Sequence, residues 1–155
     1  MLNNYPRLKK FLHYLLIHPY SARPRVWARI FVTPFIIKRG CGSIIRHSAR
    51  LDIIPSKRLV VGKRAIIEDY ALINNCMGDV IIGDHSMILS RSKVVGPVVI
   101  GQNVIVSSGS HITGLTHDYE DITRPIRLQG VTTNLTTIED DVWIGGNAAI
   151  NQGIT

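Results

Sequence analysis

His117 is the side chain of this 155-residue chain best placed to do chemistry. It ends the stretch IGQNVIVSSGSHITGLTH, in which an aliphatic residue recurs every six positions, at Ile100, Val106 and Ile112. The spacing then stops for twenty residues, DYEDITRPIRLQGVTTNLTT, and resumes at Ile138. An imidazole exchanges a proton near neutral pH, and loops that leave a rigid scaffold often carry functional side chains. We therefore expect a functional site where the regular spacing ends.

The elements that must hold this histidine are predicted by the six-residue period. Val61, Ile82 and Ile100, each followed by glycine, start successive coils, and a further, incomplete set begins at Ile138. The first coil is three residues longer than the second, with the extra residues near Gly78. A short strand with one inward side chain and a tight corner, repeated three times, closes one coil of a triangular prism. A β-sandwich would require period-two alternation, which this chain lacks. The sequence therefore predicts an all-β solenoid.

The charge of the chain is unevenly distributed. Residues 1–64 hold fourteen of the eighteen Lys and Arg and a single acid, Asp52, which gives +13. The remaining ninety-one residues hold four basic and ten acidic residues, which gives −6. A basic head on an acidic body is typical of a segment that meets a membrane surface or another anionic partner, and equally of a solvated face or an oligomer contact. Nucleic acid is not expected, because the aromatic residues among the basic ones follow helical patterns.

The start of the basic segment predicts a helix. Residues 6–18, PRLKKFLHYLLIH, place apolar side chains at helical spacing, with Pro6 in the first turn and Pro19 at the end. The run is too short to span a bilayer and lacks the cleavage pattern of a secretory signal. We expect the helix to pack on its own domain, although a helix lying in a membrane interface has the same pattern. Its apolar stripe consists of Leu8, Phe11, Leu12, Leu15 and Leu16.

The segment between this helix and the repeat predicts a short second helix. It spans residues 25 to about 32 and is followed by an extended entry segment, a glycine turn and an irregular first coil that caps the repeat. We therefore expect residues 1–50 to form a basic helical and entry segment and residues 51–155 to form the solenoid. The two cysteines are thirty-five residues apart, which predicts two reduced thiols in a cytoplasmic protein rather than a disulfide framework or a zinc site.

The repeat segments VGKRAI, IIGDHSMI, VVIGQNVI and IEDDVWIGGNAAINQGIT resemble the hexapeptide-repeat acyltransferases. The resemblance covers roughly residues 55–155 and implies a left-handed parallel β-helix. From residue 97 onward, a Thr-His pair, a loop and DVWIGGNA follow one another, which is similar to the branch that acetylates sugar hydroxyls, such as the maltose, galactoside and polysaccharide O-acetyltransferases. The resemblance therefore implies transfer of an acetyl group from acetyl-CoA to a sugar hydroxyl, in the synthesis of a surface polysaccharide or lipopolysaccharide.

In that family the histidine before the loop is the general base, and His117 matches it. A sugar hydroxyl becomes a useful nucleophile when an imidazole removes its proton, and the oxyanion that develops on the thioester needs fixed donors. We take the backbone amides of Gly145 and Gly146 as candidates for those donors. Trp143 matches the family's tryptophan near the pantetheine arm of CoA, although it could also pack at a subunit contact.

Three residues after His117 are candidates for binding the substrates. Asp118 is the first choice to orient the imidazole, although a backbone carbonyl could do the same. Tyr119 and Arg124 are candidates for contacts with the acceptor or with the CoA phosphates. The family has an asparagine one coil before the histidine that contacts the acceptor, and Met87 stands at that place here, so this role stays unassigned.

The resemblance also implies an assembly and a location. The family forms homotrimers whose active sites lie between neighbouring chains, so the same is expected here, in the cytoplasm and with the basic segment available to the inner membrane surface. Relatives continue beyond the point that matches Thr155, so we expect the solenoid to be incomplete at its C-terminal end.

Two other functions compete with acetyl transfer. A carbonic anhydrase on this scaffold needs three histidines around zinc, but His85, His111 and His117 fall on different sides of the predicted prism, so no metal is expected. The chain could also be a non-enzymatic module in which the basic head binds a membrane or a partner and the repeat acts as a spacer.

Overall fold

The fold is known from a computed structural model that describes residues 6–18 and 23–155, apart from the side chains of residues 6, 9 and 13. Three parallel five-stranded sheets form the three sides of a prism. Sheet 1 contains β1 (Ile37–Arg39), β4 (Leu59–Val61), β7 (Val80–Ile82), β10 (Val98–Ile100) and β15 (Thr136–Ile138). Sheet 2 contains β2 (Ile44–Ile45), β5 (Ile66–Ile67), β8 (Met87–Ile88), β11 (Ile105–Val106) and β16 (Trp143–Ile144). Sheet 3 contains β3 (Arg50–Asp52), β6 (Leu72–Asn74), β9 (Lys93–Val95), β12 (His111–Thr113) and β17 (Ala149–Ile150).

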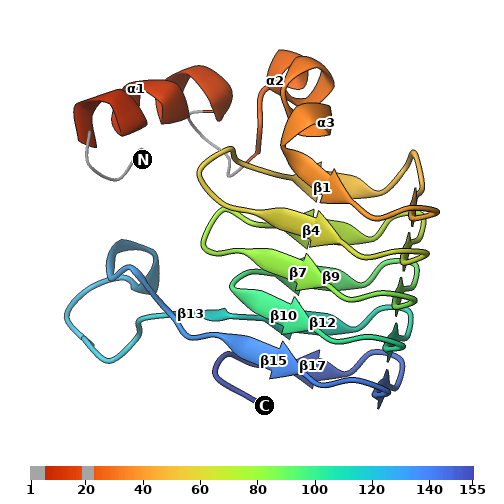
Figure 1. The fold of residues 1–155 in the computed structure, drawn as a ribbon. Coiled ribbons are helices and arrows are strands. Elements are labelled where there is room, and N and C mark those ends of the chain that lie inside the picture. The colour runs from red at the N-terminus through yellow and green to blue at the C-terminus, as the bar shows by residue number, and fades with distance from the viewer. Residues whose placement is uncertain (1–5, 19–22) are drawn as a thin grey trace.

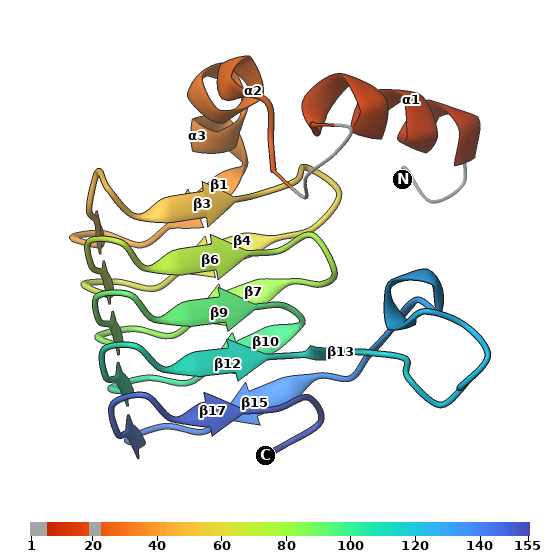
Figure 2. The same cartoon turned by 180° about the vertical axis from the view of Figure 1, so that it is seen from behind.

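The coils wind with a left hand. In Figure 1 the strands of sheet 1 run to the right across the near face, and the chain turns back at the right edge, where sheet 2 is seen edge-on. The view from behind in Figure 2 shows the strands of sheet 3 again running to the right, so the chain returns leftward on the far side of Figure 1. Because each coil lies below the one before it, this path is left-handed. The expected left-handed parallel β-helix is confirmed. Its hand is opposite to the right-handed connection that parallel strands nearly always have.

The core is a stack of aliphatic side chains that repeats from coil to coil. In each three-residue strand of sheet 1 from β4 to β10, the outer two residues are buried and the middle one is partly exposed. Full burial of an aliphatic side chain stabilises the fold by about 1.5–3 kcal/mol. Each aliphatic residue of the six-residue repeat therefore adds to the free energy of unfolding. The fully buried members include Leu59, Ile67, Ile73, Ile82, Ile88, Val94, Ile100 and Ile112.

The corners follow from the same stacking. Gly62 follows β4, and a Cβ there would lie 2.5 Å from the backbone nitrogen of Asp84 in the next coil, so only glycine fits. The register moves by 21 residues from Leu59 to Val80 but by 18 from Val80 to Val98. The three extra residues lie between Asn74 and Val80, which confirms the insertion expected near Gly78.

The first coil is regular, contrary to expectation. Strands β1, β2 and β3 pair in register with β4, β5 and β6, so the prism begins at Ile37 rather than at residue 51. Residues expected to be an extended entry segment form α3 (Thr33–Ile36), because Pro34 suits the first turn of a helix. The second helix is confirmed as α2 (Val26–Phe31).

The N-terminal helix is present as α1 (Pro6–Leu16), but the expected packing of its apolar stripe on the prism is wrong. Leu8, Phe11 and Leu15 are exposed, and Figure 1 shows α1 extending away from the prism beside α2 and α3. Pro19, expected to end the helix, lies outside the described residues. In the part of the chain that is described, no helix is long and apolar enough to cross a membrane.

Candidate functional site

The regular coils are interrupted between β12 and β15 by a protruding loop. The chain leaves the prism as β13 (Leu115–His117), forms the short 3-10 helix η2 (Ile126–Leu128), and returns as β14 (Val131–Thr133). β13 and β14 pair in antiparallel fashion, with His117 opposite Val131. The Asn134 backbone N–H donates to the carbonyl of Gly114 at 2.9 Å and closes the neck of the loop. His117 is thus an exposed side chain on a short hairpin that a rigid coil holds in place.

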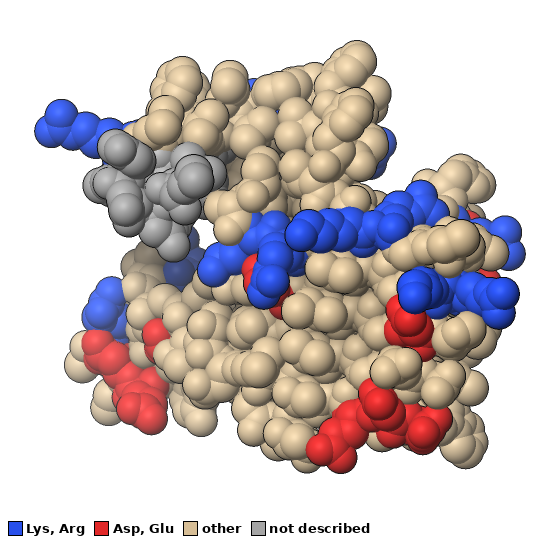
Figure 3. Space-filling view, in the orientation of Figure 1, with Lys and Arg blue, Asp and Glu red and all other residues tan. Residues whose placement is uncertain are grey.

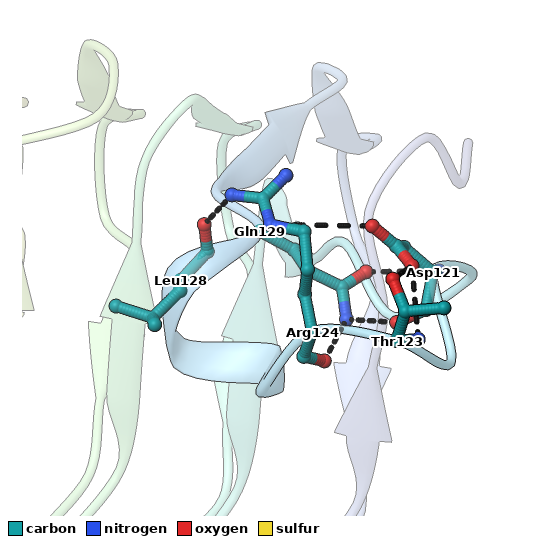
Figure 4. Close-up of polar contacts among 5 residues, drawn as sticks. All are labelled: Asp121, Thr123, Arg124, Leu128 and Gln129. Atoms are coloured by element: carbon teal, nitrogen blue, oxygen red, sulfur yellow. Dashed lines mark hydrogen bonds and ion pairs between the residues drawn. The ribbon is translucent and has the colours of Figure 1, made fainter.

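The loop is held together by its own polar side chains, and Gln129 is the central one (Figure 4). Its Oε1 accepts the backbone N–H of Asp121 at 3.1 Å, and its Nε2 donates to the carbonyls of Asp121 and Arg124, both at 2.9 Å. Arg124 in turn donates from its guanidinium to the carbonyl of Leu128 at 2.6 Å. These bonds fix the loop where the aliphatic repeat is absent.

Asp121 supplies a stable negative charge to the loop. Its Oδ1 accepts the hydroxyl of Thr123 at 2.6 Å and the Thr123 backbone N–H at 2.9 Å, and these bonds hold the pKa of the carboxyl below its usual range. The Arg124 Nε lies 4.0 Å from the other carboxylate oxygen. Arg124 is therefore partly neutralised inside the loop.

A cavity of about 500 Å³ lies between the loop and the last coil. Four of the predicted site residues, His117, Asp118, Tyr119 and Arg124, line it together. The residues that the sequence predicted to contact the acceptor therefore lie around one cavity of a single chain. The remaining lining residues are Thr116, Glu120, Asp121, Gln129, Thr132 and Gln152.

Asp118 does not hold the imidazole as the sequence suggested. Its Oδ1 accepts the hydroxyl of Thr132 at 2.7 Å, across the hairpin, and no bond joins it to His117 among the described residues. The physical reason is that the Thr132 hydroxyl, on the returning strand β14, already occupies this carboxylate oxygen. Asp118 therefore steadies the hairpin instead.

Gln152 was missed by sequence reasoning. It belongs to the last coil, yet it lines the cavity beside His117, and its buried Oε1 has no hydrogen-bond partner in the described part of the chain. Buried polar atoms are nearly always bonded, so this oxygen is a ready acceptor for a ligand. Register counting could have found it, because it follows β17, which pairs with β12 just before the loop.

Trp143, Gly145 and Gly146 lie on a different side of the prism from His117. Trp143 is on β16 of sheet 2, 75% exposed, with its Nε1 donating to Ser107 Oγ at 2.9 Å. The two glycines follow β16 at the corner toward sheet 3, whereas the loop leaves from the corner between sheets 3 and 1. Figure 1 shows the loop at the left and sheet 2 at the right, so one chain does not bring both groups together.

An apolar ladder runs down the outer face of sheet 2. In its two-residue strands the second residue points to the core and the first points outward. Each outward residue pairs with its copy in the next coil, so the ladder is continuous. Met87, which stands at the family's asparagine position, is one of its members and is therefore remote from His117 of the same chain. The ladder consists of Ile44, Ile66, Met87, Ile105 and Trp143.

His85 and His111, the other two histidines weighed for a zinc site, lie on different parts of the prism from His117. His85 occupies a corner with a φ of 61°, and His111 lies on β12. Burial, with a smaller contribution from the positive charge of Lys93, lowers the pKa of His111. In residues 6–18 and 23–155, no group of three or more His, Cys, Asp or Glu side chains could hold a metal ion.

Two family models match the repeat. "Bacterial transferase hexapeptide (six repeats)" matches residues 79–114, and "Hexapeptide repeat of succinyl-transferase" matches residues 135–155. The two matches fall on the coils before and after the loop, at the register that the sheets display. Over these residues the chain carries the hexapeptide repeat of bacterial transferases.

Relatives of this hexapeptide-repeat protein include enzymes of acyl transfer. The probable acetyltransferase Rv3034c of Mycobacterium tuberculosis is 29% identical over 126 residues, which cover 79% of this chain and 41% of the relative. The chain thus spans about two fifths of the length of that curated relative. Two solved structures share the fold.

The first is AntD, an N-acyltransferase from Bacillus cereus in complex with dTDP and 3-hydroxybutyryl-CoA, with a TM-score of 0.64 and 18% identity over 81% of this chain and 69% of AntD. The second is the acetyltransferase VCA0836 from Vibrio cholerae, with a TM-score of 0.50 and 21% identity over 97% of this chain and 69% of that one.

Proposed function

We propose that the chain is an acetyl-CoA-dependent O-acetyltransferase that acts on a sugar hydroxyl, with His117 as general base. The observation that carries the proposal is the cavity that places an exposed imidazole beside unsatisfied and charged polar groups, at the edge of a transferase scaffold. A sugar offers many hydroxyl donors, and Gln152 Oε1 and the loop carboxylates offer acceptors for them. The acceptor is most simply a sugar or glycan of surface polysaccharide or lipopolysaccharide synthesis.

The proposed chemistry needs one proton acceptor and one set of oxyanion donors. The His117 imidazole takes the proton of the sugar hydroxyl as the oxygen attacks the thioester carbonyl, and the imidazolium then returns the proton to the leaving thiolate. Acetyl-CoA supplies the activated acyl group. The Gly145 corner fits close approach of that carbonyl, because a Cβ placed there would meet nothing within 4 Å. The exposed ring of Trp143 offers a flat surface to the pantetheine arm.

The separation of His117 from Trp143 supports an active site shared between chains. The sheet 2 ladder presents apolar side chains, and the loop presents others, with Ile122 97% exposed and Ile126 and Leu128 also exposed. The loop of one chain placed on sheet 2 of the next is a head-to-tail contact, which gives a ring when the rotation between neighbours closes. We take this ring to be the homotrimer that the family resemblance implies, with His117 of one chain facing the partner's Trp143. Acyl-CoA is a cytoplasmic metabolite, so we place the enzyme in the cytoplasm.

The decisive experiment measures release of free CoA thiol from acetyl-CoA with a panel of sugars, amino sugars and nucleotide sugars. His117→Ala is expected to lower kcat by about 10²–10⁴-fold, the usual contribution of a general base. His85→Asn is the matched control, because it removes an exposed histidine from a corner where asparagine accepts the positive φ. Full activity of His117→Ala would exclude His117 as the base. Preference for an amino sugar would instead favour N-acylation, the type of reaction for which AntD is named.

A further inference from the structure

The N-terminal end of the prism exposes an unusual amount of apolar side chain. Helices α2 and α3 bury only Ala28 and Thr33. Phe35 is 86% exposed, and large side chains on all three helices share this exposure. Folded proteins rarely gather so many in one place unless the surface is covered in use. The most exposed are Phe11, Tyr14, Val26, Ile30, Phe31 and Phe35.

A band of positive charge lies directly beneath these helices. Figure 3 shows the Lys and Arg side chains gathered across the upper coils, below the tan surface of the helices, while Asp and Glu gather lower on the same face. Residues 1–64 carry +13 and the remaining residues −6. Six of the fourteen basic residues in that segment precede residue 30 and eight lie in the first two coils. The molecule is therefore layered along its axis, with helices that are apolar and basic, then a cationic band, then an acidic body. The exposed basic residues of the first two coils are Lys38, Arg39, Arg46, Lys57, Arg58, Lys63 and Arg64.

An arginine-lined cavity of about 570 Å³ connects the two layers. It lies between α2, α3 and the first coil, and Arg29, Arg39, Arg46 and Arg50 line it. Arg50 is paired with Asp52, and Arg46 approaches Glu68 at 3.7 Å. In the described part of the chain, no carboxylate lies within 4.0 Å of Arg29 or Arg39. Two guanidinium groups are therefore left without a counter-charge, and guanidinium suits the oxygens of a phosphate.

We propose that this end of the molecule docks on an anionic phospholipid surface. Side chains of α1, α2 and α3 enter the boundary between acyl chains and headgroups, and Arg29 and Arg39 meet lipid phosphates. The order of layers matches that of a leaflet, because coils stacked at about 4.8 Å put the basic band at headgroup depth when the helices lie at the acyl boundary. The acidic body is repelled by the same surface, so the prism axis stands away from it.

Charge argues for lipid rather than a second copy of the chain. A two-fold contact through this end would bring the +13 segment of one chain against the same segment of its partner, which costs free energy. An anionic membrane accepts both the apolar side chains and the positive band. Association with a membrane is independent of acyl transfer, so it can be tested without any substrate.

The test is vesicle flotation with the full chain, comparing phosphatidylcholine vesicles with vesicles that also contain about one third phosphatidylserine. We expect binding to the anionic vesicles only, and its loss in high salt. Phe31→Ser with Phe35→Ser should weaken binding by about tenfold or more through lost apolar burial. Arg29→Gln with Arg39→Gln should weaken it by about 25-fold, because one basic residue near an anionic surface contributes roughly a factor of five.

The matched control is Leu135→Ser with Arg127→Gln, which removes an exposed apolar side chain and an exposed arginine far from the helices, at the other end of the molecule. This control should bind as the parent does. Circular dichroism melting curves establish that each variant is folded. Failure of the folded parent to float with anionic vesicles would overturn the proposal, as would an equal loss in the control. Self-association that the Phe variants abolish, without vesicle binding, would assign the surface to a second copy instead.

Discussion

The two thiols of the chain lie in different surroundings. Cys41 is exposed in the first corner, whereas Cys76 is partly buried between the second and third coils, with its Sγ 3.7 Å from the carbonyl oxygen of Asp52. Burial, with a smaller contribution from the negative charge of Asp52, raises the pKa of Cys76 to about 11. The thiolate is the reactive form, so Cys76 is chemically protected at neutral pH.

This difference predicts two rates of thiol modification. At pH 8 only about one Cys76 in a thousand is ionised, so we expect it to react with a disulfide reagent at least about a hundredfold more slowly than a free cysteine, and faster as the pH approaches 11. Absorbance of the released thiolate follows both phases, and Cys41→Ser should remove only the fast one. If both thiols of the folded chain reacted equally fast, Cys76 would not lie in the partly buried surroundings described above.

Among the elements, the links between coils depend on a few buried polar contacts. Asn75 is fully buried, and its Oδ1 accepts the Ile54 backbone N–H at 2.7 Å. Its Nδ2 donates to the carbonyl of Lys57 at 2.9 Å and to that of Ile54 at 3.2 Å. One side chain thus holds the segment between β3 and β4 against the longer link that follows β6. The stability of both links rests on this amide.

Asn75→Ala is therefore expected to lower the free energy of unfolding by about 2–4 kcal/mol, because it leaves backbone groups of the buried Ile54 unpaired. Asn134→Ala is the control. Asn134 is exposed and contributes its backbone N–H to the loop neck, which the substitution retains, so the change should stay within about 0.5 kcal/mol. Urea unfolding measures both. Similar values for the two variants would show that the buried contacts of Asn75 contribute little.

The strands could be predicted from sequence, but the placement of the helices and the inner structure of the loop could not. Each coil repeats an inward aliphatic residue, and that signal survives without any tertiary information. The apolar stripe of α1 is compatible with packing on the prism or with exposure, so its pattern does not distinguish them. Gln129 has no periodic signal, because its three bonds exist only once the loop has closed. Trp143 could have been placed on sheet 2, since it lies at the same position in its coil as Ile105.

At the scale of the whole molecule, the proposed shared site makes a prediction that a site within one chain does not. His117→Ala and Trp143→Ala chains should each be poorly active alone. When they are co-expressed in equal amounts and assemble at random, one interface in four pairs an intact His117 with an intact Trp143 of the neighbour. About a quarter of the parent activity should then return.

Co-purification through two different affinity tags isolates the mixed assemblies, and light scattering gives their mass. Each mixed trimer has one intact interface of three, so about a third of the parent activity is expected in this purified fraction. The homo-assemblies of each variant, mixed after purification without exchange, provide the control and should stay inactive. Mixed assemblies that remain inactive would place the complete site within one chain or deny Trp143 its role.

The narrow neck of the loop separates the packed coils, where substitutions disturb the core, from a loop whose length and sequence can vary. The paired residues Val98 of β10 and Thr136 of β15 are 38 positions apart in the sequence. In the preceding coil the paired residues, Val80 and Val98, are only 18 positions apart. Twenty extra residues therefore leave the prism and return without disturbing its register. Mutation can lengthen, shorten or replace that segment while the packed coils stay as they are. Descendants of this chain can therefore acquire a new partner molecule at their loop without first passing through an unstable ancestor.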